Sequence, residues 1–403
     1  MSSYSKSYWL DVPLIVGDAS ELPKKASVVV IGSGLAGASA GFFLQKQGFE
    51  DVLMLDYKPE EAASYRNAGH ILYGTVESMK AMSEIHGAKK ARDLWAFSIK
   101  ICDQVETTLL ELGAEAEYRR DGYLVIADSK VEDQECKDSV KLLNSMGFES
   151  EYVDEYTIRD LGFKNCFGAR YEKGSAQAHP VKFRNALVDS YLKKGGKYCS
   201  NVQVLSVEEI ADGVEIKTAR GTLHADAAVI AGNAYSPLFS DFFKSRGLVE
   251  PFRGQIITSK PLKHDFRVKY PHSFDHGYEY ALVSSDNRLI IGGWRQNSET
   301  KEWGLYSLDT NPKIEAGLKE FVSSHYDIRE KIEWEYSWSG IMAASRTGLP
   351  FIGNTNSQRI YSVCGFTGHG FSWGHGSAQL LADIIAGAEV PEVAGYFNPR
   401  AVL

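Results

Sequence analysis

The chain has 403 residues, of which 44% are hydrophobic and 24% are charged, and its formal net charge is −8. This length allows two or three lobes with sizeable buried cores, and the composition excludes a largely disordered chain. The mild negative charge and the scattered lysines and arginines argue against nucleic acid or an anionic membrane as the main partner.

The first predicted elements are a strand over residues 27–31, a helix to about residue 47 and a strand over 51–56. Residues 1–25 in front of them are expected to form an irregular extension whose one bulky landmark is Tyr8-Trp9. The stretch "VVVIGSGLAGASAGFFL" is apolar enough to resemble a membrane span. Its four glycines and the new strand pattern behind it favour a buried strand and helix instead, so no membrane span is expected.

The rest of the chain mixes helices and strands. Its patterns predict helices over about 77–113, 133–147, 180–194, 312–325 and 371–387, and strands over 121–128, 202–210, 213–219, 221–232, 331–343 and 360–365 and within 252–295. This order predicts an α/β fold with a Rossmann-like nucleotide-binding domain made from discontinuous segments, and a second, α+β domain with a mixed, largely antiparallel sheet. The expected boundaries are 26–110, 165–250 and 340–403 for the first domain, and 111–164 and 251–339 for the second.

The cysteines and histidines show no metal-binding pattern. The cysteines are far apart, at Cys102, Cys136, Cys166, Cys199 and Cys364. A dispersed set of this kind predicts reduced thiols in a cytoplasmic protein. His369 and His375 are six residues apart with no acidic residue between them, so no metal is expected.

A glycine motif lies between the first strand and the first helix. Gly32 permits a tight turn, Gly34 lets a pyrophosphate approach the backbone, and Gly37 lets the helix pack close to the strand. Asp56 ends the second strand, where a carboxylate can accept hydrogen bonds from a ribose. These features together predict a dinucleotide, and by themselves they leave NAD and FAD both open.

A second glycine-rich stretch, "GFTGHGFSWGHG" at 365–376, leads into the last long helix. Five glycines are more than a helix cap needs, so bare backbone is expected to approach a ligand there. The alternative is a glycine-rich helix start without any ligand.

The stretch "SYRNAGHILYG" at 64–74 resembles the segment under the flavin in the glycine/D-amino-acid oxidase family. Ser64, the Arg66-Asn67 pair and Ala68-Gly69 carry this resemblance. Further landmarks are similar at 202–235, 250–262 and 340–387, so the resemblance runs through the whole chain in order. Within the family, the gamma-glutamylputrescine oxidase type is the most similar branch, because it shares the N-terminal aromatic pair and the late Gly-His-Gly.

The resemblance implies an FAD-binding domain, with the flavin ring beside residues 64–72 and 365–370. Bare amides of 368–370, at the positive end of a helix, are expected to stabilise the negative charge that the flavin gathers. The expected cofactor-binding residues are Gly32, Ser33, Gly34, Leu35, Ala36, Gly37, Asp56, Tyr57, Lys58, Ser64, Arg66, Asn67, Ala68, Gly69, His70, Val204, Ala231, Gly232, Gly340, Gly365, Thr367, Gly368, His369 and Gly370.

The chain departs from the family pattern in three places. Ser372 replaces a lysine that contacts the carboxylate in sarcosine-oxidase-like members, and Thr347 replaces a common aspartate. The stretch "GIMAASRTG" has no cysteine and no histidine precedes Gly69, so FAD is expected to be bound non-covalently. These departures favour an amine or a larger amino-acid derivative over a simple N-methyl amino acid.

The implied reaction is oxidation of a C–N bond. Hydride passes from the substrate to flavin N5, the imine is hydrolysed by water, and O2 is reduced to H2O2. The expected catalytic or substrate-contacting residues are His70, His369, Arg295, Trp294, Tyr280, Trp338 and Trp373, with Tyr73, Tyr278 and Met342 as further pocket candidates. The alternative for the aromatic residues is packing in the core, and for Arg295 it is exposure at a strand end.

Two alternatives to an oxidase stay open. A flavin amine dehydrogenase would pass its electrons to a quinone or a carrier protein, and a non-catalytic subunit would bind flavin without turnover. The sequence predicts a small-molecule amine or amino-acid substrate and gives no oligomeric state.

Overall fold

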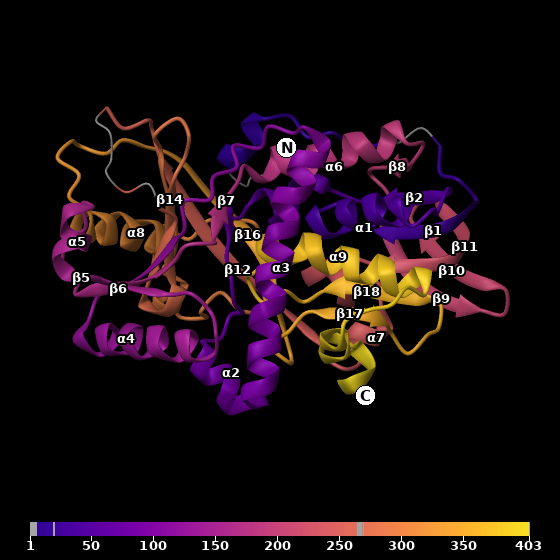
Figure 1. The fold of residues 1–403 in the computed structure, drawn as a ribbon. Coiled ribbons are helices and arrows are strands. Elements are labelled where there is room, and N and C mark those ends of the chain that lie inside the picture. Colours follow the sequence, from indigo (N-terminus) through magenta and orange to yellow (C-terminus); the bar gives the residue numbers. More distant parts are fainter. Residues whose placement is uncertain (1–5, 19–20, 264–267, 269, 403) are drawn as a thin grey trace.

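Two eight-stranded sheets lie side by side in the computed structural model (Figure 1). The structure describes residues 6–18, 21–263, 268 and 270–402. Parts of the predicted N-terminal extension, residues 1–5 and 19–20, fall outside this range.

The first sheet has the strand order β17-β18-β11-β1-β2-β8, and β10 and β9 extend it from β11 as antiparallel strands. The central strands β18, β11, β1, β2 and β8 are parallel. Bounds are β1 Lys25–Ile31, β2 Val52–Leu55, β8 Lys197–Cys199, β9 Val204–Ile210, β10 Gly213–Thr218, β11 Gly221–Ile230, β17 Phe351–Asn354 and β18 Ile360–Cys364.

Both faces of this sheet are covered, which explains why β1 is a continuous apolar run. Val28 and Val30 join a core cluster with α1, α3, α6 and α9, whereas Val29 and Ile31 join a second cluster on the opposite face. The helix bounds are α1 Leu35–Lys46, α2 Met79–His86, α3 Ala88–Leu112, α4 Lys130–Ser145, α5 Glu155–Asp160, α6 Pro180–Lys193, α7 Asp241–Lys244, α8 Pro312–His325 and α9 Gly370–Ala386.

The second sheet has the order β16-β12-β15-β14-β13-β4-β6-β5 and is antiparallel except for the pair β13–β4. Its bounds are β4 Tyr123–Ala127, β5 Glu151–Asp154, β6 Gly168–Glu172, β12 Val249–Ser259, β13 His272–Phe274, β14 Glu279–Val283, β15 Leu289–Gly293 and β16 Trp334–Ser345. One face packs on α8 and α5. A two-stranded sheet of β3 His70–Ile71 and β7 Ala176–Gln177 lies apart from both.

The fold class predicted from the sequence is confirmed: a Rossmann-like parallel sheet from discontinuous segments is joined to a largely antiparallel second sheet. Strand β6 does not belong to the sheet in which the expected domain boundaries would put it. Residues 168–172 were expected in the nucleotide domain, yet β6 pairs with β4 and β5 of the second sheet. The chain makes an excursion through α4, β5 and α5 and closes it with β6 before it returns to the first domain through α6. The domain boundaries themselves stay a prediction.

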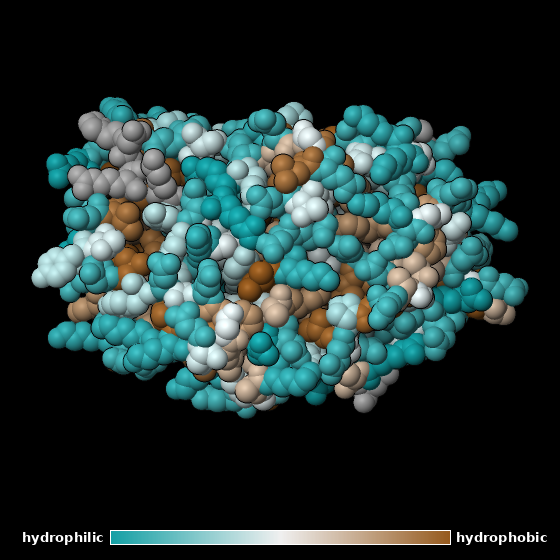
Figure 2. All heavy atoms as spheres, viewed as in Figure 1, coloured by the Kyte–Doolittle hydropathy of each residue, from teal (hydrophilic) through white to brown (hydrophobic). Residues whose placement is uncertain are grey.

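One face of the molecule is predominantly hydrophilic (Figure 2). On the face shown in Figure 2, hydrophobic residues form small scattered patches among hydrophilic ones. In the described part of the chain, no helix combines the length and apolarity that crossing a membrane requires.

Candidate functional site

A cavity of about 1120 Å³ opens between the two sheets and is lined by residues of both. The first sheet contributes the ends of β1, β2 and β11 and the start of α1, and the second contributes strands β4, β6, β12, β14 and β16. The segments 61–78 and 366–372 complete the wall. A cavity of this size, placed where two lobes meet, is typical of a cofactor and substrate site.

The turn between β1 and α1 forms the first backbone surface of the cavity. Gly32 has φ +108°, and a Cβ on Gly37 would lie 1.9 Å from the Gly32 carbonyl oxygen. Only glycine therefore lets α1 start so close to β1. Gly34 is the N-cap of α1 and has no side chain to accept a bond from the first turn. The Leu35 amide donates to the Ser64 hydroxyl at 2.8 Å, so the amides that follow it in the first turn of α1 are the ones open to an anionic ligand of the kind that the motif predicts.

Asp56 at the end of β2 fixes this turn from the side. Its Oδ2 accepts hydrogen bonds from the Ser33 amide at 2.6 Å and the Ser33 hydroxyl at 2.8 Å. Asp56 also lines the cavity, and its Oδ1 makes no bond to any residue within the described ranges. One oxygen therefore supports the turn, while the other is left for a ligand.

Two residues that the sequence analysis missed support the same turn. Arg184 of α6 is completely buried and donates to the Ser33 carbonyl at 3.0 Å, and the Tyr198 hydroxyl lies 2.7 Å from the Ser33 hydroxyl. An arginine on the apolar face of the predicted helix 180–194, beside Phe183 and Leu187, was the available signal for this role.

The start of α9 forms the second backbone surface. Thr367 and Gly368 have φ values of +48° and +86°, and the N-cap His369 makes no side-chain cap bond. The cavity is lined by residues 366–372 here. One expectation needs correction: the His369 amide is not bare, because the turn at 367–368 brings it within 2.9 Å of the Phe366 carbonyl, to which it donates. The first turn of α9 still has no side-chain cap, and its positive end faces the cavity.

His70 stands where the segment 64–70 enters the cavity wall. Its Nε2 lies 3.0 Å from the Ala281 carbonyl. A carbonyl only accepts, so Nε2 carries the proton and Nδ1 keeps its lone pair. Burial, and secondly the nearby His272, lowers the pKa of His70 to about 3. The imidazole is therefore neutral at physiological pH.

The second sheet presents one row of side chains to the cavity. Arg170, Val125, Ser273 and Tyr280 are consecutive partners across β6, β4, β13 and β14, and all four line the cavity. Tyr280 lies over Gly292 of β15, where a Cβ would come within 2.6 Å of its ring. The register of the sheet thus gathers polar side chains from positions more than a hundred residues apart.

Arg295 brings an uncompensated cation into the cavity. Its guanidinium carbon lies 4.7 Å from the ring centre of Phe252, 5.3 Å from that of Trp303 and 5.7 Å from that of Tyr278. Among the residues that the structure describes, no carboxylate lies within ion-pairing distance of it. Burial lowers the pKa of Arg295, but a guanidinium stays charged in proteins. Trp303 was not foreseen from the sequence.

The three tryptophans expected at the site do not line the cavity. Trp294 packs against Gly317 of α8, Trp338 donates to the Arg66 carbonyl at 3.2 Å, and Trp373 donates to the Gly74 carbonyl at 2.9 Å. Trp338 and Trp373 are buried core residues, and Trp294 is partly buried and packs against the core, as the packing alternative predicts. The other residues expected at the site and found in the cavity wall are Gly32, Gly34, Leu35, Ala36, Asp56, Tyr57, Lys58, Ser64, Arg66, Asn67, Ala68, His70, Tyr73, Val204, Ala231, Gly232, Tyr278, Tyr280, Arg295, Gly340, Met342, Thr367, Gly368, His369 and Gly370, whereas Ser33, Gly37, Gly69 and Gly365 lie behind it.

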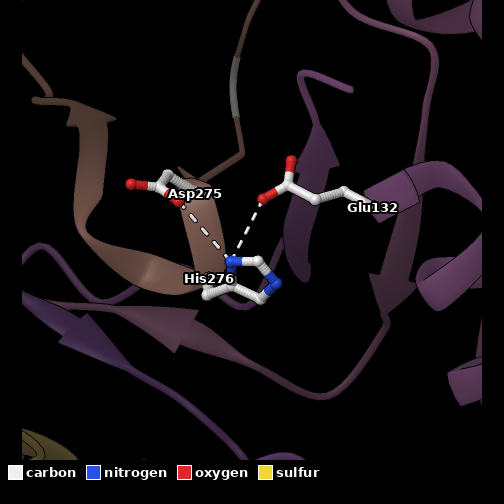
Figure 3. Close-up of side chains that lie close together, drawn as sticks. All are labelled: Glu132, Asp275 and His276. Atoms are coloured by element: carbon white, nitrogen blue, oxygen red, sulfur yellow. Dashed lines mark ion pairs between the residues drawn. The ribbon is translucent and has the colours of Figure 1, made fainter. Parts of the chain in front are cut away.

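A group of charged side chains lies at one edge of the cavity (Figure 3). His276 Nδ1 is 3.3 Å from Glu132 and 3.5 Å from Asp275, and its Nε2 is 2.9 Å from Glu135. Partial burial opposes protonation, but the carboxylates outweigh it and raise the pKa of His276. Three of these four side chains are largely exposed, which is typical of surface ion pairs. The expectation that the chain uses no metal stays a prediction.

Comparison with known proteins shows which family has this architecture. Residues 27–384 match the model of the DAO family, described as FAD dependent oxidoreductase. Gamma-glutamylputrescine oxidoreductase of Escherichia coli (strain K12) is 22% identical over 370 residues, which cover 89% of this chain and 83% of that protein. D-amino acid dehydrogenase of Vibrio atlanticus (strain LGP32) is 23% identical, over 90% of this chain and 96% of that protein. The solved structure of glycine oxidase from Geobacillus kaustophilus superposes with a TM-score of 0.80 at 19% identity, over 93% of this chain and 98% of that one.

The chain therefore belongs to the DAO family of FAD-dependent oxidoreductases. The resemblance found in the sequence is confirmed, and FAD is the cofactor. The structure fits this cofactor, because two helices start in the wall of one cavity with N-cap residues that make no side-chain cap bond, and the glycines of the α1 turn leave the backbone bare.

Proposed function

We propose that this protein oxidises the C–N bond of an amine or amino-acid derivative. The observation that carries the proposal is the joint wall of the cavity: backbone amides of two helix starts on one side, and a half-buried guanidinium with aromatic side chains on the other. The names of the similar proteins, a gamma-glutamylputrescine oxidoreductase, a D-amino acid dehydrogenase and a glycine oxidase, support an amine or amino acid as the substrate class.

FAD would be held by residues that the cavity already brings together. The first turn of α1 would receive the pyrophosphate, Asp56 Oδ1 a ribose hydroxyl, and Val204 with Ala231 the adenine side. Residues 66–70 and 367–370 would lie along the ring. When bound, FAD would supply the two-electron chemistry: it would accept a hydride from the carbon next to nitrogen and pass the two electrons, with two protons, to O2 to give H2O2, while water would hydrolyse the imine.

Arg295 is the residue we assign to a substrate carboxylate. It is the cavity cation that lies among aromatic rings, with no carboxylate of the described chain paired to it. The aromatic rings restrict the half-buried guanidinium, so an incoming carboxylate would form charge-assisted hydrogen bonds with a cation that is already held in place.

The substrate amine has to be neutral when its C–H bond breaks, and free aliphatic ammonium groups have a pKa of about 10. His70 does not serve as the general base at neutral pH, because its pKa of about 3 is far below the working range. Its Nδ1 can instead accept a hydrogen bond from the amine N–H. Burial between Tyr280, Tyr278 and Met342 would disfavour the ammonium form and so release the proton.

The proposal also concerns the identity of the electron acceptor. An oxidase using O2 is our first choice, and a dehydrogenase that passes electrons to a quinone or carrier protein is the second, which the name of the Vibrio atlanticus relative favours. We further propose that FAD is bound without a covalent link in a cytoplasmic enzyme. A denatured sample should then release all of its flavin into the supernatant.

The test is anaerobic titration of the purified yellow protein with a panel of amines and amino-acid derivatives. Loss of the flavin absorbance near its long-wavelength maximum with one substrate class supports the function and identifies the class. Admitting air afterwards separates the acceptors, since fast return of the colour supports the oxidase and slow return the dehydrogenase. If no amine or amino-acid derivative bleaches the flavin, the proposed function is wrong and a non-catalytic flavin subunit is favoured.

A further inference from the structure

The N-terminal aromatic pair Tyr8-Trp9 has no role in the function described so far, yet Trp9 lies in the seam between the two lobes. Its side chain is only 2% exposed. It packs in one cluster with Tyr65 and Ala68 of the first lobe and with Leu282 and Trp338 of the second sheet. A residue from an arm outside both sheets thus fills the core where they meet.

Two indoles hold consecutive carbonyls of the segment that lines the flavin side of the cavity. Trp9 Nε1 donates to the Asn67 carbonyl at 2.7 Å, and Trp338 Nε1 donates to the Arg66 carbonyl at 3.2 Å. Each bond fixes the direction of one peptide plane, because the planar peptide unit turns as a whole. Arg66 and Asn67 line the cavity, so the two indoles fix their backbone from behind.

The side chains of the same segment are tied down as well. The Asn67 side chain accepts from the Gly69 amide at 2.7 Å and donates to the Ser64 carbonyl at 2.9 Å. Arg66 Nη1 donates to the Ser339 carbonyl of β16 at 2.7 Å. The bond from Trp9 is therefore the link that joins this network to the N-terminal arm.

The arm, residues 7–15, is anchored on both lobes. On the second sheet, the Tyr8 hydroxyl donates to Asp286 at 3.0 Å and the Tyr336 hydroxyl donates to Asp11 at 2.6 Å. On α6 of the first lobe, Asn185 donates to the Pro13 carbonyl at 2.9 Å and accepts from the Ile15 amide at 3.0 Å. The arm therefore spans the seam with polar bonds at both ends and Trp9 buried between them.

We propose that Trp9 is a positioning residue for the flavin: its indole N–H on the Asn67 carbonyl, together with Trp338 on the Arg66 carbonyl, sets the backbone that meets the ring. Docking of the arm thereby controls FAD affinity and the electronic environment of the flavin. The inference rests on FAD occupying this cavity as proposed, and it gives Trp338 a role through the backbone rather than in contact with substrate.

The test compares Trp9→Phe with Tyr191→Phe. The first variant keeps an aromatic ring and loses the indole donor. The matched control also loses a buried donor to backbone carbonyls, since the Tyr191 hydroxyl bonds the Val52 and Lys197 carbonyls at 2.5 and 2.8 Å, on β2 and β8 and away from the segment 64–70. Removing one buried hydrogen bond of this kind should raise the FAD dissociation constant about tenfold in Trp9→Phe. Tyr191→Phe should lower the unfolding temperature and leave the FAD dissociation constant within about twofold of wild type.

The flavin spectrum and midpoint potential provide a readout that a purely structural role would not move. Trp9→Phe and Trp338→Phe should both shift them in the same direction, and Tyr191→Phe should not. If the two tryptophan variants match Tyr191→Phe in FAD affinity, spectrum and potential, the inference is overturned. Wild-type protein that fails to bind FAD would overturn the proposed function instead.

Two further variants keep the test decisive if Trp9→Phe does not fold. Incorporation of benzothienylalanine at position 9 keeps the indole shape without its N–H and should reproduce the loss in affinity. Tyr336→Phe loosens the arm at Asp11 and should raise the FAD dissociation constant two- to threefold. Wild-type affinity and spectrum in both would contradict the inference.

Discussion

The two halves of the cavity are built by different means. The nucleotide half is made mainly of backbone: the turn at Gly32–Gly34, the start of α1 and the start of α9. The substrate half is made of side chains that come from separate elements of the second lobe, such as Tyr280 of β14 and Arg295 in the turn after β15. A backbone surface tolerates almost no added atom, whereas a side-chain surface can change its chemistry without moving its strands. The nucleotide half should therefore govern whether the protein binds FAD, and the substrate half which molecule it oxidises.

The largest effect is expected from a substitution that disrupts the nucleotide half. In Gly37→Ala the new Cβ would lie 1.9 Å from the Gly32 carbonyl oxygen, so α1 has to move away from β1. FAD affinity should fall by about 100-fold or more, because the amides of α1 lose their position. Flavin content of the purified protein and fluorescence titration with FAD measure this. Gly395→Ala, where no atom lies within 4 Å, is the control and should bind FAD normally.

The next effect concerns the substrate half alone. Arg295→Gln removes the cation assigned to the substrate carboxylate, and the loss of charge-assisted bonds, about 2–3 kcal/mol, should raise KM for carboxylate-bearing substrates about 30- to 150-fold. FAD affinity should not change. Steady-state kinetics on a substrate and its decarboxylated analogue measure the effect, and an equal loss for both would contradict the role assigned to Arg295.

Two buried histidines, His70 and His375, test the comparison through the pH dependence of the unfolding free energy. Burial lowers the pKa of His375, which lies between Ser39 and Thr108, to about 3, the value that His70 also has. The ordinary pKa of 6.5 applies in the unfolded chain, so the unfolded state binds more protons between pH 6.5 and 3 and stability falls as the pH decreases through this window.

Replacing either histidine should therefore weaken the loss of stability at low pH, but only one replacement should also affect the substrate. His375→Gln should reduce the loss of unfolding free energy between pH 7 and pH 5 by about 1–2 kcal/mol, without changing the substrate KM. His70→Gln should flatten the same curve and also change KM, because His70 lines the cavity. Denaturant unfolding at the two pH values measures both, and an unchanged pH dependence in both variants would contradict their burial as neutral groups.

The smallest effect tests the aromatic support of Arg295. Trp303 is 36% exposed and its ring centre is 5.3 Å from the guanidinium. Trp303→Leu should raise KM two- to fivefold, in line with a cation–π contribution of about 0.5–1 kcal/mol at such sites. In the Arg295→Gln background the same change should have no effect on KM, and additive losses would contradict the pairing.

Much of the nucleotide half could be predicted from the sequence because its determinants are local. Gly32, Gly34, Gly37 and Asp56 lie within one strand–helix–strand unit, and each requirement is a steric or hydrogen-bonding demand on neighbouring residues. The strand and helix pattern around them followed from periodicity in the same way. The exceptions are Arg184 and Tyr198, which reach the turn from other elements.

The substrate half depended on the register of the second sheet. Tryptophans 294, 338 and 373 were expected at the site, but none lines the cavity. For Trp338 of β16 the reason is that alternate positions of a strand face opposite sides, and the sequence does not say which side carries the cavity. Trp373 lies in α9 and Trp294 in the turn after β15, and there the packing of neighbouring elements decided the direction of the side chain. Trp303 was missed because a loop brings it to Arg295.

By itself, then, the sequence determined most of the nucleotide half and the order of the elements, since these depend on contacts between residues close along the chain. Only the tertiary structure decided that Trp9 and Trp338 fix the carbonyls of residues 67 and 66, and that Arg295 has no carboxylate partner within the described residues. The physical reason is that these features are contacts between distant segments, and packing of the two lobes against each other sets their distances.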